Sequence, residues 1–170
     1  GWLAEPVDPP RTPLWIWGAG HVGRAVVQIA SQLEEFDITW IDTGSERFPS
    51  DTPVNVNVVP VAEPAHLMGH APKEAQHLIF TYSHALDLDL CDAALNRGFA
   101  FCGLIGSTSK WARFKSRLSS LGHSNNSILD ITCPIGEPNL GKQPIAIAIG
   151  VVQSLLSLHI RSAVQRSAHL

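Results

Sequence analysis

The chain has 170 residues, of which 45% are apolar and 16% charged, and its formal net charge at pH 7 is −3. This length fits one domain with a substantial core, and the composition excludes a disordered chain and a coiled coil. The slight acidity gives no electrostatic footprint for nucleic acid or for an anionic membrane surface. No stretch of 18 residues is uninterruptedly apolar, so we expect no transmembrane helix. With no signal-peptide pattern either, we expect a cytoplasmic protein with reduced cysteines.

Strands and helices alternate along the sequence. Residues 1–12 are proline-rich and typical of a linker, and the leading glycine suggests a missing N-terminal region. We expect strands at 13–17, 38–42, 54–58, 77–81 and 99–104, and helices at 21–33, 85–96, 107–121 and 143–168. This alternation predicts an α/β fold over residues 13–170, a Rossmann-like doubly wound parallel sheet in three layers with a long C-terminal helix.

The predicted sheet has two further features. The strict alternation in 54–58 indicates a half-exposed edge strand, and the crossover at 43–53 is too short and too rich in Ser, Asp and Pro for a helix. With the common strand order 3-2-1-4-5, the first and fourth strands are neighbours and a crevice opens at their carboxyl ends.

A glycine motif joins the first strand to the first helix. Gly18, Gly20 and Gly23 have the spacing G-x-G-x-x-G, and Asp42 ends the next strand 19 residues after the third glycine. Gly18 permits a tight turn, Gly20 lets backbone N–H groups approach a phosphate, and Gly23 lets the helix pack on the strand. Asp42 is placed to accept hydrogen bonds from a ribose-like diol. The pattern predicts nucleotide or pterin-phosphate binding, although a glycine turn also serves plain helix–sheet packing.

Polar residues follow the fourth strand. His84 begins a helix with Asp87 in its first turn, and the predicted topology places His84 across the crevice from His21. A histidine at a helix N-terminus tends to stay neutral, which suits hydrogen bonding or metal ligation. The alternative is that Ser83 or His84 only caps the helix.

A second strand-to-helix turn contains Gly106, Ser107 and Lys110 and is a candidate second anion cradle. The alternative is a capped helix with a solvated lysine. Cys133 is a candidate soft ligand for molybdenum, or else a buried, inert thiol. His66 and His70 lack a third ligand at metal-site spacing.

Five blocks of sequence, in this order, resemble the C-terminal Rossmann domain of the XdhC/CoxI family, the accessory proteins of xanthine dehydrogenase and related molybdenum hydroxylases of bacteria. The blocks are Gly18–Arg24, Asp42 with Arg47-Phe48-Pro49, Tyr82–His84 with Asp87, Gly103–Ser107 with Lys110, and Pro134–Gly136 with Gly141-Lys142. The chain departs from the family pattern at Gly44, where a basic residue is usual. Either Arg47 replaces that residue or the contact is lost.

The resemblance implies a cofactor chaperone rather than a turnover enzyme. Such a protein binds the molybdenum cofactor (molybdopterin), assists its sulfuration with a cysteine desulfurase, and delivers it to the molybdenum subunit of xanthine dehydrogenase. The implied cofactor-binding residues are Gly18, Gly20, His21, Val22, Gly23, Asp42, Tyr82, Ser83, His84, Asp87, Gly106, Ser107 and Lys110, with Cys133 as a candidate metal ligand.

Two other hypotheses stay open from the sequence. The domain is alternatively an NAD(P)-dependent oxidoreductase or dinucleotide-binding module, with Asp42 on the ribose and His84 as acid or base. In the third hypothesis it is a dimerisation piece, forming a homodimer through the apolar stripe of the terminal helix. That stripe serves equally well to cover the domain's own sheet.

Overall fold

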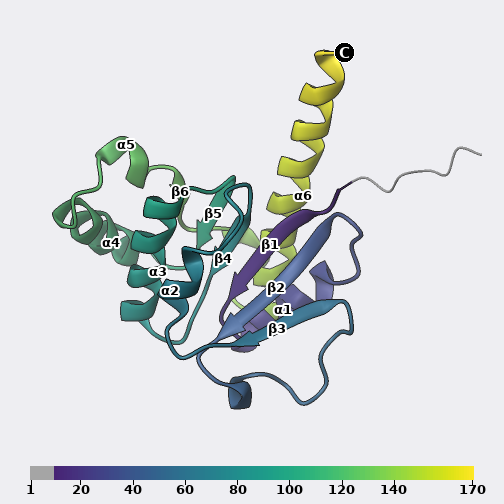
Figure 1. Cartoon of the computed structure of the whole chain (residues 1–170), viewed down its shortest axis with the longest axis horizontal. Helices are drawn as coiled ribbons and strands as arrows, with labels where there is room; N and C mark the ends of the chain where they lie inside the picture. Colours follow the sequence, from purple (N-terminus) through teal and green to yellow (C-terminus); the bar gives the residue numbers. More distant parts are fainter. Residues whose placement is uncertain (1–9) are drawn as a thin grey trace, which may run out of the picture.

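Figure 1 shows the computed structural model, which describes residues 10–170. Most of the linker predicted for 1–12 lies outside these described residues. One parallel sheet organises the described chain, with the strand order β3-β2-β1-β4-β5-β6. Its strands are β1 (Thr12–Trp17), β2 (Phe36–Asp42), β3 (Val56–Pro60), β4 (Gln76–Ile79), β5 (Phe101–Leu104) and β6 (Ile131–Thr132). This is the strand order of the Rossmann fold, and it confirms the predicted architecture.

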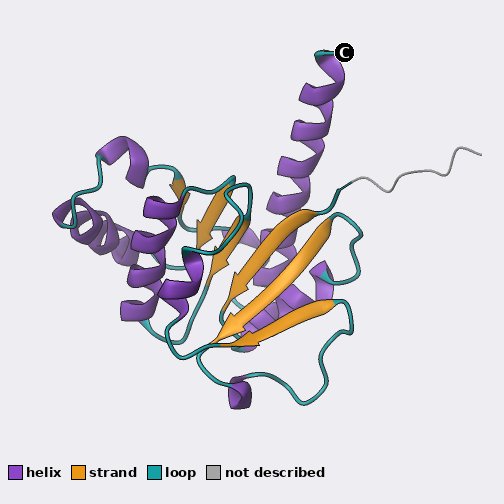
Figure 2. Ribbon diagram, viewed as in Figure 1, coloured by secondary structure: helices purple, strands orange, loops and turns teal. Residues whose placement is uncertain are grey.

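Helices cover both faces of the sheet (Figure 2). They are α1 (His21–Ala30), α2 (Pro64–Met68), α3 (His84–Arg97), α4 (Thr108–Ser120), α5 (Asn125–Ile128) and α6 (Pro144–Ala168), with 3₁₀ turns η1 (Ser45–Arg47) and η2 (Pro138–Leu140). Because side chains alternate along a strand, β1 sends Leu14 and Ile16 to the core under α1 and α6, and Trp17 to the core under α2, α3 and α4. The result is the predicted three-layer arrangement.

The sequence patterns did not predict the shortest helices and strands. The sequence did not predict α2, α5 or β6, because segments of two to five residues are too short to show a hydrophobic period. The strand predicted at 54–58 runs instead from Val56 to Pro60, and Val54 is fully exposed. As predicted, β3 is an edge strand.

The crossover from β2 to β3 contains only the turn η1 and no helix, as predicted. Phe48 anchors this crossover in the core by packing edge-on against Trp40, with ring centroids 5.1 Å apart. Arg47 is the residue before this anchor. The crossover therefore holds the Arg47 backbone at the carboxyl-terminal end of the sheet.

The first half of α6 packs against α1 and contributes Ala148, Val151 and Leu155 to the core. Its second half extends beyond the sheet (Figure 1, yellow). By length and hydropathy alone, α6 is the one helix of residues 10–170 that could cross a membrane, and 28% of its most apolar window is buried. A single helix of this kind is weak evidence for a membrane span, so the expected absence of a transmembrane helix stays a prediction.

Candidate functional site

The glycine turn between β1 and α1 is wedged between two neighbouring strands. Gly18 N–H donates to Ile41 O at 2.8 Å, and Gly18 has a φ of 121°. A Cβ on Gly18 would lie 2.4 Å from Phe80 O, and one on Gly23 would lie 2.1 Å from Gly18 O. Only glycine fits at these two positions. Gly18 and Gly23 therefore shape the turn.

Gly20 has a different role. It precedes α1 with an extended backbone, and no described side chain caps the helix. The first turn of α1 also has no acidic residue. A Cβ on Gly20 would meet nothing within 4 Å, so space is open in front of the helix. Uncapped N–H groups and the positive end of the helix dipole together favour an anion at this place.

A cavity of about 520 Å³ lies in front of this helix end, and we name it the charged chamber. It lies where β1 and β4 end side by side, as the predicted topology requires. Its lining residues are Ala19, Gly20, His21, Val22, Arg24, Asp42, Glu46, Arg47, Phe80, Thr81, Tyr82 and Ile105. Of the predicted site residues, the structure brings together Gly20, His21, Val22, Asp42 and Tyr82.

The charged chamber is lined by charges of both signs, the arginines Arg24 and Arg47 and the acids Asp42 and Glu46. Arg24 Nε donates to Ala19 O and its Nη2 donates to Arg47 O, both at 2.9 Å. The Arg47 guanidinium lies 3.8 Å from the centre of the Tyr82 ring. This stack joins the β2–β3 crossover to the segment after β4. Sequence reasoning noted Arg47 only through the family resemblance. The signal that points to it is a basic residue on a long crossover at the ligand edge of the sheet.

Asp42 lines the charged chamber, but its carboxylate is occupied. The side chain is 4% exposed; its Oδ2 accepts the Ala19 N–H at 2.8 Å and its Oδ1 accepts the Thr43 N–H at 2.6 Å. These bonds fix the glycine turn against the end of β2. The geometry does not favour the predicted role of Asp42 as the acceptor for a ribose diol.

Asp87 and Lys110 form a buried ion pair beneath the site. Lys110 Nζ lies 2.8 Å from Asp87 Oδ2 and also donates to Ile105 O at 3.0 Å. Asp87 Oδ1 accepts from both the N–H and the hydroxyl of Thr81. Both charged side chains are buried in this pair and line neither the charged chamber nor the cavity beside α4, so the geometry favours a structural role for them over the predicted ligand contacts. The pair instead ties the ends of β4 and β5 together.

Two other predicted residues cap helices, as the alternatives expected, although Lys110 is buried rather than solvated. Ser83 Oγ accepts the Leu86 N–H at 3.2 Å and caps α3, and Ser107 Oγ accepts the Lys110 N–H at 3.1 Å and caps α4. His84 is exposed and lines neither the charged chamber nor the cavity beside α4, so its place across the crevice from His21 stays a prediction.

A second cavity, of about 540 Å³, adjoins the first, and we name it the apolar chamber. It lies between the start of α4 and the loop that leads to α6. Its lining residues are Val22, Ile105, Gly106, Ser107, Thr108, Pro134, Ile135, Gly136, Glu137, Pro138, Gly141, Lys142 and Ile147. Val22 and Ile105 line both chambers. The two predicted turns therefore lie on one edge of the sheet, with adjoining cavities in front of them.

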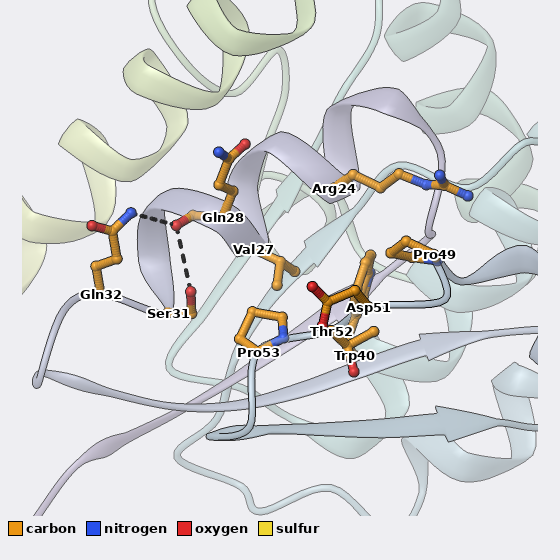
Figure 3. Close-up of a pocket in the computed structure, with 10 residues that line it drawn as sticks. All are labelled: Arg24, Val27, Gln28, Ser31, Gln32, Trp40, Pro49, Asp51, Thr52 and Pro53. Atoms are coloured by element: carbon orange, nitrogen blue, oxygen red, sulfur yellow. Dashed lines mark hydrogen bonds between the residues drawn. The ribbon is translucent and has the colours of Figure 1, made fainter.

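A third pocket, of about 530 Å³, lies between α1 and the crossover at 49–53 (Figure 3). Gln28 O accepts from Gln32 Nε2 at 2.8 Å and from Ser31 Oγ at 3.4 Å along its helix wall. Arg24 lines both this pocket and the charged chamber. The pocket contains none of the predicted site residues.

Cys133 is half-buried and packs with the core under α3 and α4, whereas Pro134 and Ile135 line the apolar chamber. Burial raises the pKa of its thiol to about 11, although the charge of Lys110 partly opposes this shift. No group of three metal-ligating side chains occurs among residues 10–170. This setting does not favour the predicted metal-ligand role of Cys133.

The raised pKa predicts slow alkylation of Cys133. At pH 8 we expect the thiol to react with iodoacetamide about 100-fold more slowly than an unstructured cysteine peptide, because the thiolate is the nucleophile. The rate should rise tenfold per pH unit until pH approaches the thiol pKa of about 11. Mass spectrometry of the modified peptide across pH measures this. Reaction as fast as the peptide's at neutral pH would restore the metal-ligand hypothesis.

A parallel sheet in Rossmann order, with a glycine turn and an uncapped helix at the carboxyl ends of its strands, defines a Rossmann-type domain. The model of the XdhC Rossmann domain family matches residues 14–155, and the chain belongs to this family.

Two known proteins are similar to this chain. The uncharacterized protein YqeB of Escherichia coli strain K12 is 27% identical over 150 residues, which are 87% of this chain and 27% of YqeB. A crystal structure from Bacillus halodurans, described as a xanthine dehydrogenase, has a TM-score of 0.76 at 23% identity and covers 93% of this chain and 47% of its own. The chain thus spans less than half of either relative.

Proposed function

We propose that this domain is the cofactor-binding part of a maturation factor for a molybdenum hydroxylase of the xanthine dehydrogenase kind. In this proposal the charged chamber binds the phosphate of a pterin-type molybdenum cofactor. Membership of the XdhC Rossmann domain family supports the assignment to cofactor maturation. The observation that carries the ligand assignment is the uncapped N-terminus of α1, which opens into a cavity lined by Arg24 and Arg47.

The residues present suit the phosphate of such a cofactor. Gly20 leaves open the space that a Cβ would otherwise enter, and the first-turn N–H groups of α1 are free of side-chain caps. Arg24 and His21 flank that space, and backbone bonds hold Arg24 in place. When bound, the cofactor brings the molybdenum centre that a hydroxylase needs. Cys133 lies outside both chambers, so this chain's own contribution is to bind and orient the ligand rather than to ligate the metal.

The partners belong to the same proposal. A maturation factor receives the cofactor, holds it while a cysteine desulfurase supplies sulfur, and passes it to the molybdenum subunit of the hydroxylase. The domain's part in these steps is to expose one side of the bound cofactor to each partner, because both chambers lie at one edge of the sheet.

One observation favours the dinucleotide alternative. The glycine motif lies between the first strand and the first helix of a sheet with the Rossmann strand order. Against it, Asp42 is 4% exposed and already accepts two backbone N–H bonds. Because so little of the carboxylate is exposed, it offers a ribose diol little surface to contact. We therefore rank pterin phosphate ahead of NAD(P).

A binding titration tests the proposal. A fluorescent pterin carrying a 6-alkyl phosphate should saturate the domain at micromolar concentration, measured by fluorescence anisotropy. The same pterin without its phosphate should bind at least about 10-fold more weakly, since charge-assisted bonds are the stronger hydrogen bonds. NADH serves as the competing ligand. Tighter binding of NADH than of the pterin phosphate, or no difference between the two pterins, would overturn the proposal.

A further inference from the structure

The apolar chamber has the features of a small-molecule pocket. Its volume of about 540 Å³ falls in the range typical of ligand sites, and its walls are predominantly apolar, with Ile135, Ile147 and Pro138 among them. Its lining also includes a few polar side chains, those of Ser107, Thr108, Glu137 and Lys142. The phosphate contacts proposed above do not use this chamber.

The two chambers differ in which part of a ligand they suit. At the charged chamber α1 is uncapped, whereas at the apolar chamber Ser107 caps α4 and Lys110 is held by Asp87. The helix end at the apolar chamber thus already has a polar partner. An anion is favoured in the charged chamber, and a flat, weakly polar group is favoured in the apolar chamber.

The boundary between the chambers allows one molecule to occupy both. Val22 and Ile105 line both cavities and are only partly buried, so a ligand can cross over their exposed surfaces. A ligand that extended from α1 toward β2 would be less favourably placed. There the carboxylate of Asp42 is occupied, and Arg47 stacks on Tyr82.

We infer that the ligand is a two-part molecule, a phosphate joined to a flat ring system, which runs from the N-terminus of α1 across Val22 and Ile105 into the apolar chamber. This inference rests on the proposed function and adds the place and direction of the ring. The ligand then lies over the ends of β1, β4 and β5. It lies away from the end of β2, where the ribose of a dinucleotide would bind.

Thr108→Trp tests the inference by filling the apolar chamber from α4. Thr108 is exposed at the first position of that helix, and its neighbour Ser109 is exposed but lines no described cavity, so Ser109→Trp is the matched control. We expect Thr108→Trp to weaken binding of the pterin phosphate at least tenfold and Ser109→Trp to change it less than twofold. Inorganic phosphate, followed by the amide chemical shifts of Gly20 and His21, should bind both variants like the original protein.

The outcomes separate the two proposals. Equal pterin affinity in the two tryptophan variants, with phosphate still shifting the Gly20 amide, would overturn the inference and leave the proposed function standing. Failure of both phosphate and pterin phosphate to bind the unaltered chain would overturn the proposed function and the inference with it. If Thr108→Trp does not fold, Lys142→Trp fills the chamber from the opposite loop and is expected to give the same loss.

Discussion

Replacing Gly20 with aspartate should weaken binding of a phosphate-bearing ligand about 100-fold or more while leaving the domain folded. The new carboxylate would cap α1 and occupy the place of the anion, and like charges about 4 Å apart repel by several kcal/mol at the effective dielectric of a protein surface. The space in front of Gly20 is open, so the added side chain meets no steric obstacle. Anisotropy titration with the pterin phosphate measures the loss.

Gly20→Asn is the matched control, because it has nearly the same shape and caps the helix without a charge. Its binding should fall about tenfold, from competition for the N–H groups alone. Both variants should keep the original free energy of unfolding to within a few tenths of a kcal/mol, because glycine itself is a tolerable cap. If Gly20→Asp binds the pterin phosphate with an affinity within threefold of the unaltered protein, the N-terminus of α1 is not part of the binding site.

Replacing Lys110 with methionine should lower the free energy of unfolding by about 3–5 kcal/mol, because it leaves the Asp87 carboxylate buried without its partner. Asp87 is 1% exposed and Lys110 5%. The lysine also donates to Ile105 O, a residue that lines both chambers. Urea unfolding followed by circular dichroism measures the loss.

Lys115→Met is the control on the same helix, since Lys115 is exposed, and it should cost less than about 1 kcal/mol. Combining Lys110→Met with Asp87→Asn removes the buried charge while keeping an oxygen that can accept from Thr81. The double variant should recover more than half of the lost stability. If the double variant is no more stable than Lys110→Met alone, the buried charge of Asp87 is not the cause of the lost stability.

The sheet and its glycine turn could be predicted because they depend on local patterns. Apolar runs separated by helical periods predicted the long strands and helices, and the glycine spacing predicted the turn. The position of Gly20 at an open helix end also follows from the motif. Short elements such as β6 could not be predicted, since two residues carry no period.

The roles of charged residues were harder to predict, because each depends on a partner far along the chain. Lys110 follows a glycine turn, which suggested an anion cradle, yet its partner is 23 residues away. A signal was present in the sequence. Asp87 shares the buried face of its helix with Leu90 and Ala94, and Lys110 shares that of α4 with Phe114. Opposite charges on the buried faces of consecutive helices indicate an internal ion pair.

The carboxylate of Asp42 gives the binding turn its order before any ligand arrives. Because it holds the Ala19 and Thr43 amides at the end of β2, the loop has already lost the conformational entropy that a floppy turn would lose on binding. If α1 binds the ligand as we propose, capture there is a docking event on a preorganised frame, and we expect its association rate to be governed by diffusion rather than by loop folding.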